Sequence, residues 1–415
     1  MKYILIGAGN RGMTYADWAV AHGIEIAAIA ELRPDRLQDA AARLLVPHNM
    51  CFSDGKDLLA LGKIADAAII ATMDRDHYGH VMAALDCGYD ILLEKPISPD
   101  PGECLEIEHK ANALGRKITV CHVLRYTNFF GQLKQIIDSG ELGKIVAIKH
   151  AENIGNFHMA HSFVRGNWRN DRESSPIIMQ KSCHDLDILL WLTGSHCTKV
   201  AAFGGLSYFR ESNAPAESAQ RCLDCPVAEN CRFDAMKAYL PMLGQWPADV
   251  VCLEPTEEAL REALRTGPYG RCVYRCDNNV CDHMSIILEF ENGVTATFSL
   301  TAQTSAVHRS IHIMCEDGEI EADDKERKII VRHHVANQGE TFDERIIHVR
   351  TNGSGHGGGD AGIMEDFSAS LTESGESRSS ISKSVESHLM ACAIEESRVT
   401  GKMVDMEDFR RKLSN

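Results

Sequence analysis

The first 124 residues alternate short apolar runs with amphipathic helical patterns. Apolar runs of the length of a buried strand occur at 3–6, 24–30, 65–72, 90–94 and 117–124. Helical spacing follows the first run and continues at 35–45, 77–88 and 101–115. Because regular alternation of this kind is typical of a doubly wound sheet, it predicts an α/β Rossmann domain over residues 1–124.

From residue 125 onward the pattern changes to longer amphipathic strands. They are expected at 144–152, 285–291, 295–302, 309–315, 328–334 and 345–350, with an Asn-Gly hairpin turn at 292–293. Two helices are expected between 363 and 400, the second ending at Gly401. The sequence therefore predicts an α+β domain over 125–415 with an open, mostly antiparallel sheet. A Cys-rich insertion at about 211–282 interrupts it.

A G-x-G-x-x-G motif lies between the first predicted strand and the first predicted helix. The first glycine permits a tight turn, the second lets a pyrophosphate approach the backbone, and the third lets helix pack on strand. The free N–H groups of the helix N-terminus then attract the phosphates. Candidate cofactor contacts in this motif are Gly7, Gly9, Asn10, Arg11 and Gly12.

Glu31 ends the second predicted strand, 19 residues beyond Gly12. A carboxylate at this position accepts hydrogen bonds from both ribose hydroxyls and repels a 2′-phosphate, so NAD(H) is the predicted cofactor. Arg33 would partly offset that repulsion, which leaves room for some use of NADP(H).

The amino-acid composition and net charge of the chain restrict the kinds of molecule that it is expected to bind. The chain has 43 Lys and Arg against 59 Asp and Glu, a formal charge of −16, which argues against nucleic acid and anionic membranes as partners. No membrane-length apolar stretch or signal peptide is evident, and most of the 15 cysteines stand singly in apolar runs. A reducing cytoplasmic setting is therefore expected.

Glu94, Lys95 and Pro96 follow the fourth predicted strand. Ligands of open α/β sheets bind at the carboxyl ends of the strands, and a proline after the lysine restricts its backbone. A lysine held there can polarise a carbonyl or share a proton with an alcohol. The alternative for any single lysine is a solvated surface position, but the strand end favours a role in the site.

At this point the sequence resembles the Gfo/Idh/MocA oxidoreductases over most of its length. The resemblance rests on the glycine motif, Ala71-Thr72 with His77, Glu94-Lys95-Pro96, Arg125-Tyr126, Asn167-Trp168-Arg169 and His184-Asp185-Leu186-Asp187. It implies that Lys95 is the essential lysine of hydride transfer and that His184 contacts the substrate alcohol. It also implies a homodimer or homotetramer that pairs through the open sheet. Further cofactor contacts implied by it are Thr72, His77, Glu94, Lys95, Trp168 and Arg169.

The chain departs from this family at one catalytic position. Many members carry an aspartate four residues before the histidine, where this chain has Gln180, followed by Lys181. Glutamine cannot take a proton, so acid–base work would fall on Lys95, His184 or Lys181. Without the family resemblance, His184 would be interpreted as a histidine at a helix N-terminus whose ring is hydrogen-bonded to Asp187.

Polar residues near strand ends favour a polyhydroxylated, carbohydrate-like substrate. A glycine-rich loop at 353–360, which precedes a helix, is a candidate lid. Taken singly, each of these positions is as well explained by an ordinary polar loop. Candidate substrate contacts are Arg125, Tyr126, Asn153, His158, Arg165, Asp187, His283 and His356.

These features predict an NAD(H)-dependent oxidoreductase that moves hydride to or from a secondary carbinol of a sugar or sugar derivative. The alternative is an NAD-dependent glycoside hydrolase, which oxidises C3 transiently, eliminates the aglycone, adds water and returns the hydride. A third interpretation is a non-catalytic sugar or nucleotide sensor, against which the intact Lys95 and His184 argue.

A cysteine cluster in the insertion points to a metal. Cys222, Cys225 and Cys231 fall within ten residues, and tetrahedral thiolate ligation of a structural zinc fits this spacing. Cys272 is the predicted fourth ligand, with Cys276 as the second choice. An iron–sulfur cluster is the alternative metal group.

Overall fold

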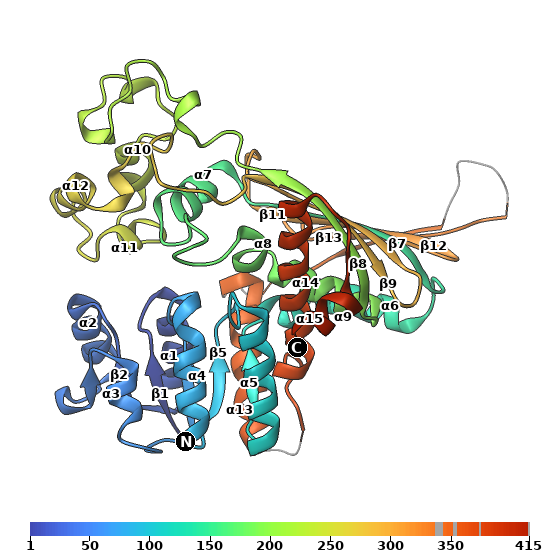
Figure 1. Ribbon diagram of the computed structural model, residues 1–415, viewed down its shortest axis with the longest axis horizontal. Helices are drawn as coiled ribbons and strands as arrows, with labels where there is room; N and C mark the ends of the chain where they lie inside the picture. Colours follow the sequence, from blue (N-terminus) through green and yellow to red (C-terminus); the bar gives the residue numbers. More distant parts are fainter. Residues whose placement is uncertain (337–342, 352–354, 373–374, 414–415) are drawn as a thin grey trace.

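The structure, a computed structural model, describes residues 1–336, 343–351, 355–372 and 375–413. Its first sheet has six parallel strands in the order β3-β2-β1-β4-β5-β6, so the strand order reverses between β1 and β4 (Figure 1). The strands are β1 Lys2–Ile6, β2 Glu25–Ala30, β3 Cys51–Phe52, β4 Ala67–Ile70, β5 Asp90–Leu93 and β6 Ile118–Val120. The helices are α1 Asn10–Ala21, α2 Pro34–Leu44, α3 Gly55–Leu59, α4 His77–Asp86 and α5 Pro101–Leu114. The predicted Rossmann architecture is confirmed.

Strand β1 shows why the apolar runs form a central sheet. Its alternate residues belong to two different cores: Ile4 and Ile6 to one, Tyr3 and Leu5 to the other. All four side chains are at most 1% exposed. Burial of an aliphatic side chain of this size stabilises the fold by about 1.5–3 kcal/mol, so a strand buried on both faces must be apolar throughout.

The second sheet has nine strands in the order β14-β13-β12-β11-β7-β10-β9-β8-β15. Only the β7–β10 pair is parallel among its described strands, so the predicted open, mostly antiparallel sheet is confirmed. The strands are β7 Ile145–Asn153, β8 Cys197–Gly205, β9 His283–Phe290, β10 Thr295–Thr301, β11 His308–Cys315, β12 Gly318–Asp323, β13 Lys328–His333, β14 Asp343–His348 and β15 Val404–Asp405.

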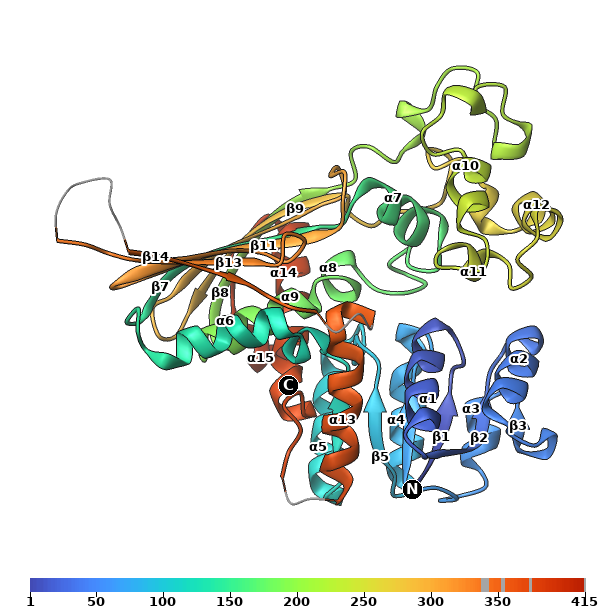
Figure 2. The ribbon, with the colours of Figure 1, turned by 180° about the vertical axis from the view of Figure 1, so that it is seen from behind.

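Helices cover one face of this second sheet, and the other face is open (Figures 1 and 2). The covering helices are α6 Asn128–Ser139, α9 Cys183–Thr193, α14 Ile381–Thr400 and α15 Met406–Leu413. Short helix α8 Ile177–Gln180 lies between this sheet and the first domain, and short helix α7 Asn156–His158 lies between the sheet and the insertion (Figure 2). The C-cap of α14 is Gly401 in the left-handed conformation, as the sequence predicts.

Helix α13 Gly359–Thr372 ties the C-terminal half of the chain to the first domain. Ile363, Met364 and Phe367 belong to the same core as Tyr3 and Leu5 of β1. The ring of Phe367 lies 5.7 Å from that of Tyr3. The sequence boundary at 124/125 therefore separates the two sheets but not the two cores.

The insertion forms a separate lobe beyond the second sheet, on the side of α2 (Figure 1). Its helices are α10 Ala235–Tyr239, α11 Ala248–Val251 and α12 Glu257–Thr266. Thr256 caps α12, which buries Leu260 and Leu264 in a small core of its own. This amphipathic helix is not among the elements that the sequence predicts. None of the described helices is both long and apolar enough to cross a membrane.

Candidate active site

The glycine motif forms a turn that leaves α1 open at its N-terminus. Gly7 has φ +91°, and a Cβ on Gly12 would lie 2.0 Å from the Gly7 carbonyl oxygen, so neither position accepts a side chain. Gly9, by contrast, faces open space apart from the guanidinium of Arg36. Gly9 is also the N-cap of α1 and provides no side-chain cap, while Asn10 is exposed. Free N–H groups and open space above them fit a dinucleotide pyrophosphate.

Glu31 stands at the end of β2 with its carboxylate held by the backbone. It accepts hydrogen bonds from the N–H groups of Ala8, at 2.8 Å, and Arg33, at 3.0 Å. The guanidinium of Arg33 donates to Asp35 at 3.1 Å. Arg33 is therefore already paired, while Arg36, which the sequence analysis did not single out, is the cation nearest to Gly9.

Arg11 does not point at the cofactor groove but joins two carboxylates. Its Nε lies 2.8 Å from Glu94, and its Nη2 lies 2.6 Å from Asp360 at the start of α13. Tyr15 also donates to Glu94, whose other oxygen accepts from the Lys95 N–H at 2.7 Å. Burial raises the pKa of Glu94, but Arg11 and Lys95 outweigh it and hold the pKa below its usual value. Glu94 thus links Arg11 to the backbone of Lys95, and the predicted contacts of Arg11 and Glu94 with the cofactor stay a prediction.

Lys95 follows β5, and its ammonium donates to the Gln180 carbonyl oxygen at 2.6 Å. The Gln180 side chain is also fixed, because its amide nitrogen donates to the carbonyls of Trp168, at 3.0 Å, and Ser175, at 2.5 Å. Gln180 therefore anchors the lysine and the preceding loop through its carbonyl and amide nitrogen, while its side-chain oxygen stays without a partner among the described residues.

His77 is buried at the start of α4 between two backbone carbonyls. Its Nδ1 lies 2.6 Å from the Pro96 oxygen and its Nε2 lies 3.2 Å from the Thr72 oxygen. The ring thus braces the ends of β4 and β5, where the sequence analysis placed direct contacts of Thr72 and His77 with the cofactor.

Lys181 belongs to a buried charge network on the helix-covered face of the second sheet. Its ammonium lies 3.2 Å from Glu152 of β7. Glu152 also pairs with Arg309 at 2.6 Å, and Arg309 pairs with Asp185, which accepts from His150. Burial lowers the pKa of Lys181. Because Lys181 already has a carboxylate partner, it is a weaker candidate for the catalytic base than the sequence implied.

Two of the histidines predicted to contact the substrate, His184 and His158, lie near Lys95 and are neutral at pH 7. Burial lowers the pKa of His184, in the first turn of α9, well below its usual value, and Lys95 acts in the same direction. Burial likewise lowers the pKa of His158, followed by the charge of Lys181. The ring of His356 lies 6.5 Å from that of His184. Residues 353 and 354 of the predicted lid loop lie outside the described residues.

Three residues of the segment 180–184, whose Gln180 carbonyl holds Lys95, each have a buried polar atom without a hydrogen-bond partner among the described residues. These atoms are the Oε1 of Gln180, the Oγ of Ser182 and the Nδ1 of His184. An unsatisfied buried polar group costs about 1–3 kcal/mol. A cluster of such groups beside a lysine is typical of a site that a hydroxylated ligand completes.

Arg125 and Asp187, two predicted substrate contacts, are paired with each other. Two hydrogen bonds of 2.7 Å join the guanidinium to the carboxylate. Asp187 therefore does not satisfy His184, as the simplest reading of the sequence had it. Tyr126 is also engaged structurally, since its hydroxyl contacts Asp366, Ser377 and Ser379.

Trp168 and Arg169 are placed by polar contacts of different kinds. The indole Nε1 of Trp168 donates to Asp74 after β4, at 3.3 Å, which holds the ring beside the first domain. Arg169 pairs with Asp277 of the insertion at 2.8 Å and with Glu173 at 2.9 Å. Its guanidinium therefore fastens the insertion, and its predicted position near the nicotinamide stays a prediction.

The remaining predicted substrate contacts lie apart from the lysines. Along β7, burial alternates so that Glu152 is on the helix-covered face and Asn153 on the opposite face. His283 is on an exposed position of β9 and pairs with Asp282 at 2.8 Å. Arg165 is buried against the insertion. No hydrogen bond or ion pair among the described residues joins Asn153, His283 or Arg165 to Lys95 or Lys181, so their contact with the substrate stays a prediction.

The predicted zinc ligands are not arranged as a metal group. All cysteines of the chain are free, and among the described residues no three His, Cys, Asp or Glu side chains form a set that could hold a metal ion. Cys222, Cys225, Cys231 and Cys272 nevertheless line one small cavity of the insertion.

Comparison with solved structures finds the whole fold in known proteins. An oxidoreductase domain protein from Kribbella flavida superposes with a TM-score of 0.74 at 15% identity, covering 97% of this chain and 98% of that one. A levoglucosan dehydrogenase, in a complex with NADH and levoglucosan, has a TM-score of 0.72 at 18% identity, covering 98% and 99%.

Sequence relatives agree with this fold. The putative oxidoreductase YteT of Bacillus subtilis is 24% identical over 316 residues, which are 73% of this chain and 72% of YteT. Inositol 2-dehydrogenase of Corynebacterium glutamicum (strain ATCC 13032) is 28% identical over 199 residues, 47% of this chain and 55% of that protein. The chain thus spans about half the length of the inositol dehydrogenases that it matches.

Two family descriptions cover almost the entire chain. Residues 1–122 match the NAD-binding Rossmann fold of an oxidoreductase family, and residues 134–406 match the C-terminal alpha/beta domain of the same family. Together with the open glycine motif and the lysine at the end of β5, these matches show that the chain belongs to the Gfo/Idh/MocA family of NAD-binding oxidoreductases.

Proposed function

We propose that the protein is an NAD(H)-dependent dehydrogenase acting on a secondary carbinol of a sugar or sugar derivative. One observation carries the proposal: the ammonium of Lys95, held by the Gln180 carbonyl, lies near the buried, neutral His184, whose Nδ1 has no partner among the described residues. A cation next to a neutral base is what oxidation of an alcohol requires.

The two side chains divide the work on the substrate hydroxyl. Lys95 donates a hydrogen bond to the substrate oxygen and stabilises the negative charge that develops there. His184, with its pKa well below its usual value, accepts the hydroxyl proton as the carbinol becomes a carbonyl. When bound, the nicotinamide supplies the acceptor for the hydride. Gly9, the free end of α1 and Glu31 are the groups that would hold the dinucleotide.

The substrate class is supported by relatives and by the site. The named relatives with an assigned activity are inositol and levoglucosan dehydrogenases, which act on polyhydroxylated rings. The unpartnered atoms of Gln180 and Ser182 supply further hydrogen-bonding groups suited to neighbouring hydroxyls.

A turnover screen of the full chain with NAD and a panel of cyclic polyols, aldoses and anhydrosugars tests the proposal through NADH formation. We expect Lys95→Met to lower kcat at least about 100-fold, a transition-state loss of about 2.7 kcal/mol, with little change in NAD affinity. Lys56→Met, on the surface of the same domain, is the matched control. A Lys95→Met enzyme with more than about a tenth of wild-type activity contradicts the assignment.

A redox-neutral NAD-dependent glycosidase is the second candidate, and His158 is the observation that favours it. This route needs an additional base to remove the C2 proton. His158 is neutral and close to both lysines, and no hydrogen bond to its ring is found among the described residues. Release of aryl aglycones by enzyme with bound NAD, without net NADH, would establish this chemistry in place of simple dehydrogenation.

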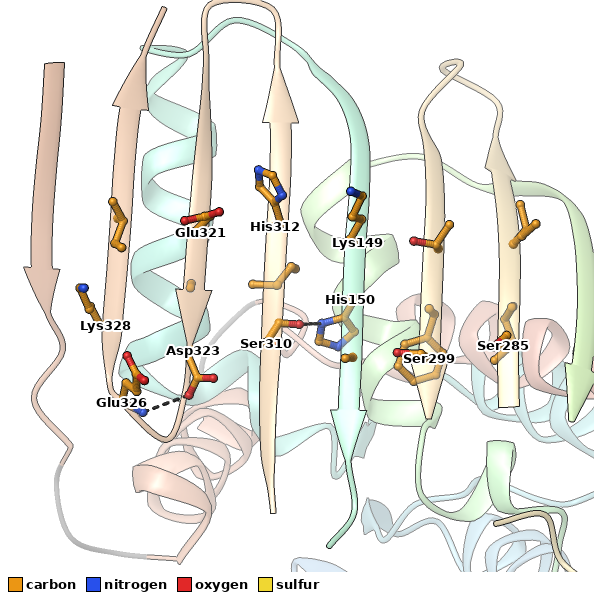
Figure 3. A pocket seen from close by; sticks show the side chains of 18 of the residues that line it. Lys149, His150, Ser285, Ser299, Ser310, His312, Glu321, Asp323, Glu326 and Lys328 are labelled. Atoms are coloured by element: carbon orange, nitrogen blue, oxygen red, sulfur yellow. Dashed lines mark hydrogen bonds between the residues drawn. The ribbon is translucent and has the colours of Figure 1, made fainter. Parts of the chain in front are cut away.

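We also propose that two copies of the chain pair through the open face of the second sheet. This face carries a hollow of about 770 Å³ whose lining includes charges of both signs, among them Lys149, Lys328, Glu321 and Glu326 (Figure 3). Such a mixture suits a self-complementary contact. Phe203 at the rim is 73% exposed. Light scattering of Phe203→Glu, which should shift the protein to smaller species, is the test.

A further inference from the structure

The small cavity of the insertion is lined by four sulfur-bearing side chains. Cys222, Cys225, Cys231 and Cys272 surround it together with Arg165, and its volume of about 20 Å³ is room for one small ion or water. Local structure brings the cysteines together. The Cys225 N–H donates to the Cys222 carbonyl at 3.2 Å, and the Cys272 N–H donates to Gln220 at 2.9 Å.

Arg165 is a buried cation without a carboxylate partner. It is 2% exposed, and its guanidinium donates to the carbonyls of Arg271, at 2.7 Å, and Phe233, at 2.8 Å. The third contact is to the sulfur of Cys222 at 3.2 Å. Among the described residues no carboxylate lies within ion-pair distance of Arg165. Asp234 also lines the cavity, and its carboxylate accepts a hydrogen bond from the backbone N–H of Lys237 at the N-terminus of helix α10.

The lining of the cavity carries two cations, Arg165 and Arg221, against one carboxylate, Asp234, and neutral thiols do not correct this imbalance. A buried guanidinium without a counter-charge costs several kcal/mol. Free thiolates around the cavity would supply negative charge, but they would repel one another. A divalent cation held by thiolates removes both difficulties, because four thiolates and one Zn²⁺ carry a net charge of −2, which Arg165 partly neutralises.

We propose that the insertion binds one structural zinc ion through Cys222, Cys225, Cys231 and Cys272, with Arg165 as its buried counter-charge. Binding releases four thiol protons to solvent for each zinc taken up. The sulfur atoms do not form a ligand set in the described residues, so they must turn inward around the ion. The charge of Arg165 is the new element in this proposal, beyond cysteine spacing.

Arg165 connects the proposed metal site with the active site. Arg165 ends the helical segment Met159–Arg165, which follows directly on His158 near Lys95 and Lys181. The metal therefore holds the wall of the active site in place, without touching the reacting atoms. Loss of zinc should weaken substrate binding more than it changes NAD binding.

Elemental analysis of the purified full chain, without a metal-binding tag, is the first test. We expect about one zinc per chain, with closure of the site by four cysteines. Cys225→Ser and Cys231→Ser should each lower the zinc content at least fivefold and lower the melting temperature. Cys252→Ser, in the same insertion but outside the cavity lining, is the matched control and should retain zinc.

A second measurement uses the wild-type chain, so its result does not depend on whether the cysteine variants fold. Titration of the wild-type chain with an organomercurial should release one equivalent of zinc, detected with a chromogenic chelator. A folded chain with far less than stoichiometric zinc overturns the proposal. So does iron with acid-labile sulfide in place of zinc. Retention of zinc by Cys272→Ser together with its loss from Cys276→Ser overturns the assignment of the fourth ligand.

Discussion

Replacing Arg125 by methionine tests whether this arginine stabilises the fold or binds the substrate. The guanidinium is 6% exposed, and its partner Asp187 is fully buried, so the variant would leave a carboxylate in the interior without its cation. The closest other candidate is His122, whose Nε2 lies 3.9 Å from Asp187. Burial lowers the pKa of His122 well below its usual value, so at neutral pH it brings no charge.

Breaking a buried ion pair by removal of one partner costs about 3–5 kcal/mol. Burial raises the pKa of Asp187 although Arg125 lowers it, while Asp187 raises the pKa of Arg125. These two shifts favour opposite protonation states for the pair. Two hydrogen bonds of 2.7 Å join the groups, and only an ionised carboxylate accepts both from the guanidinium. Asp187 and Arg125 are therefore both charged.

Urea unfolding followed by circular dichroism measures the change at one fixed protein concentration, because subunit association makes stability concentration-dependent. We expect Arg125→Met to lose about 3–5 kcal/mol, and Arg125→Met with Asp187→Leu to recover most of it. Arg33→Met, which breaks the exposed pair with Asp35, should cost less than about 1 kcal/mol. A stable Arg125→Met with a tenfold higher KM for the sugar would refute the reasoning.

Three further outcomes follow from the geometry. Gly12→Ala, whose Cβ would lie 2.0 Å from the Gly7 carbonyl oxygen, should abolish NAD binding in a fluorescence titration. Glu31→Ala should weaken NAD binding and reduce discrimination against NADP, as the ratio of the two dissociation constants will show. His388, which accepts from the Ile97 N–H at 2.9 Å, has its pKa lowered by burial from 6.5 to about 3. The unfolded chain therefore binds more protons, stability falls as pH drops through this window, and His388→Gln should lessen that fall by about 1.4 kcal/mol per pH unit.

Local signals in the sequence determined the first domain and the outline of the site. Gly7 and Gly12 are required by contacts between neighbouring segments, and Glu31 and Lys95 follow strands whose burial on both faces is visible as apolar runs. Six of the nine strands of the second sheet were equally readable, because period-two patterning records which face is buried, while β8, β12 and β15 were not predicted. Strand β12, Gly318–Asp323, was missed because its six residues mix glycine and acids with few apolar positions.

Tertiary structure alone decided which polar residues are free for chemistry. Arg11, Arg125 and Arg169 look alike as site cations in the sequence, yet each is paired with at least one carboxylate that lies 62 or more residues away. Which carboxylate meets which guanidinium depends on how the two sheets and α13 pack, and no local pattern encodes that. The same packing left Lys95 and His184 available, because the partner of Lys95 is a carbonyl and the Nδ1 of His184 has none among the described residues.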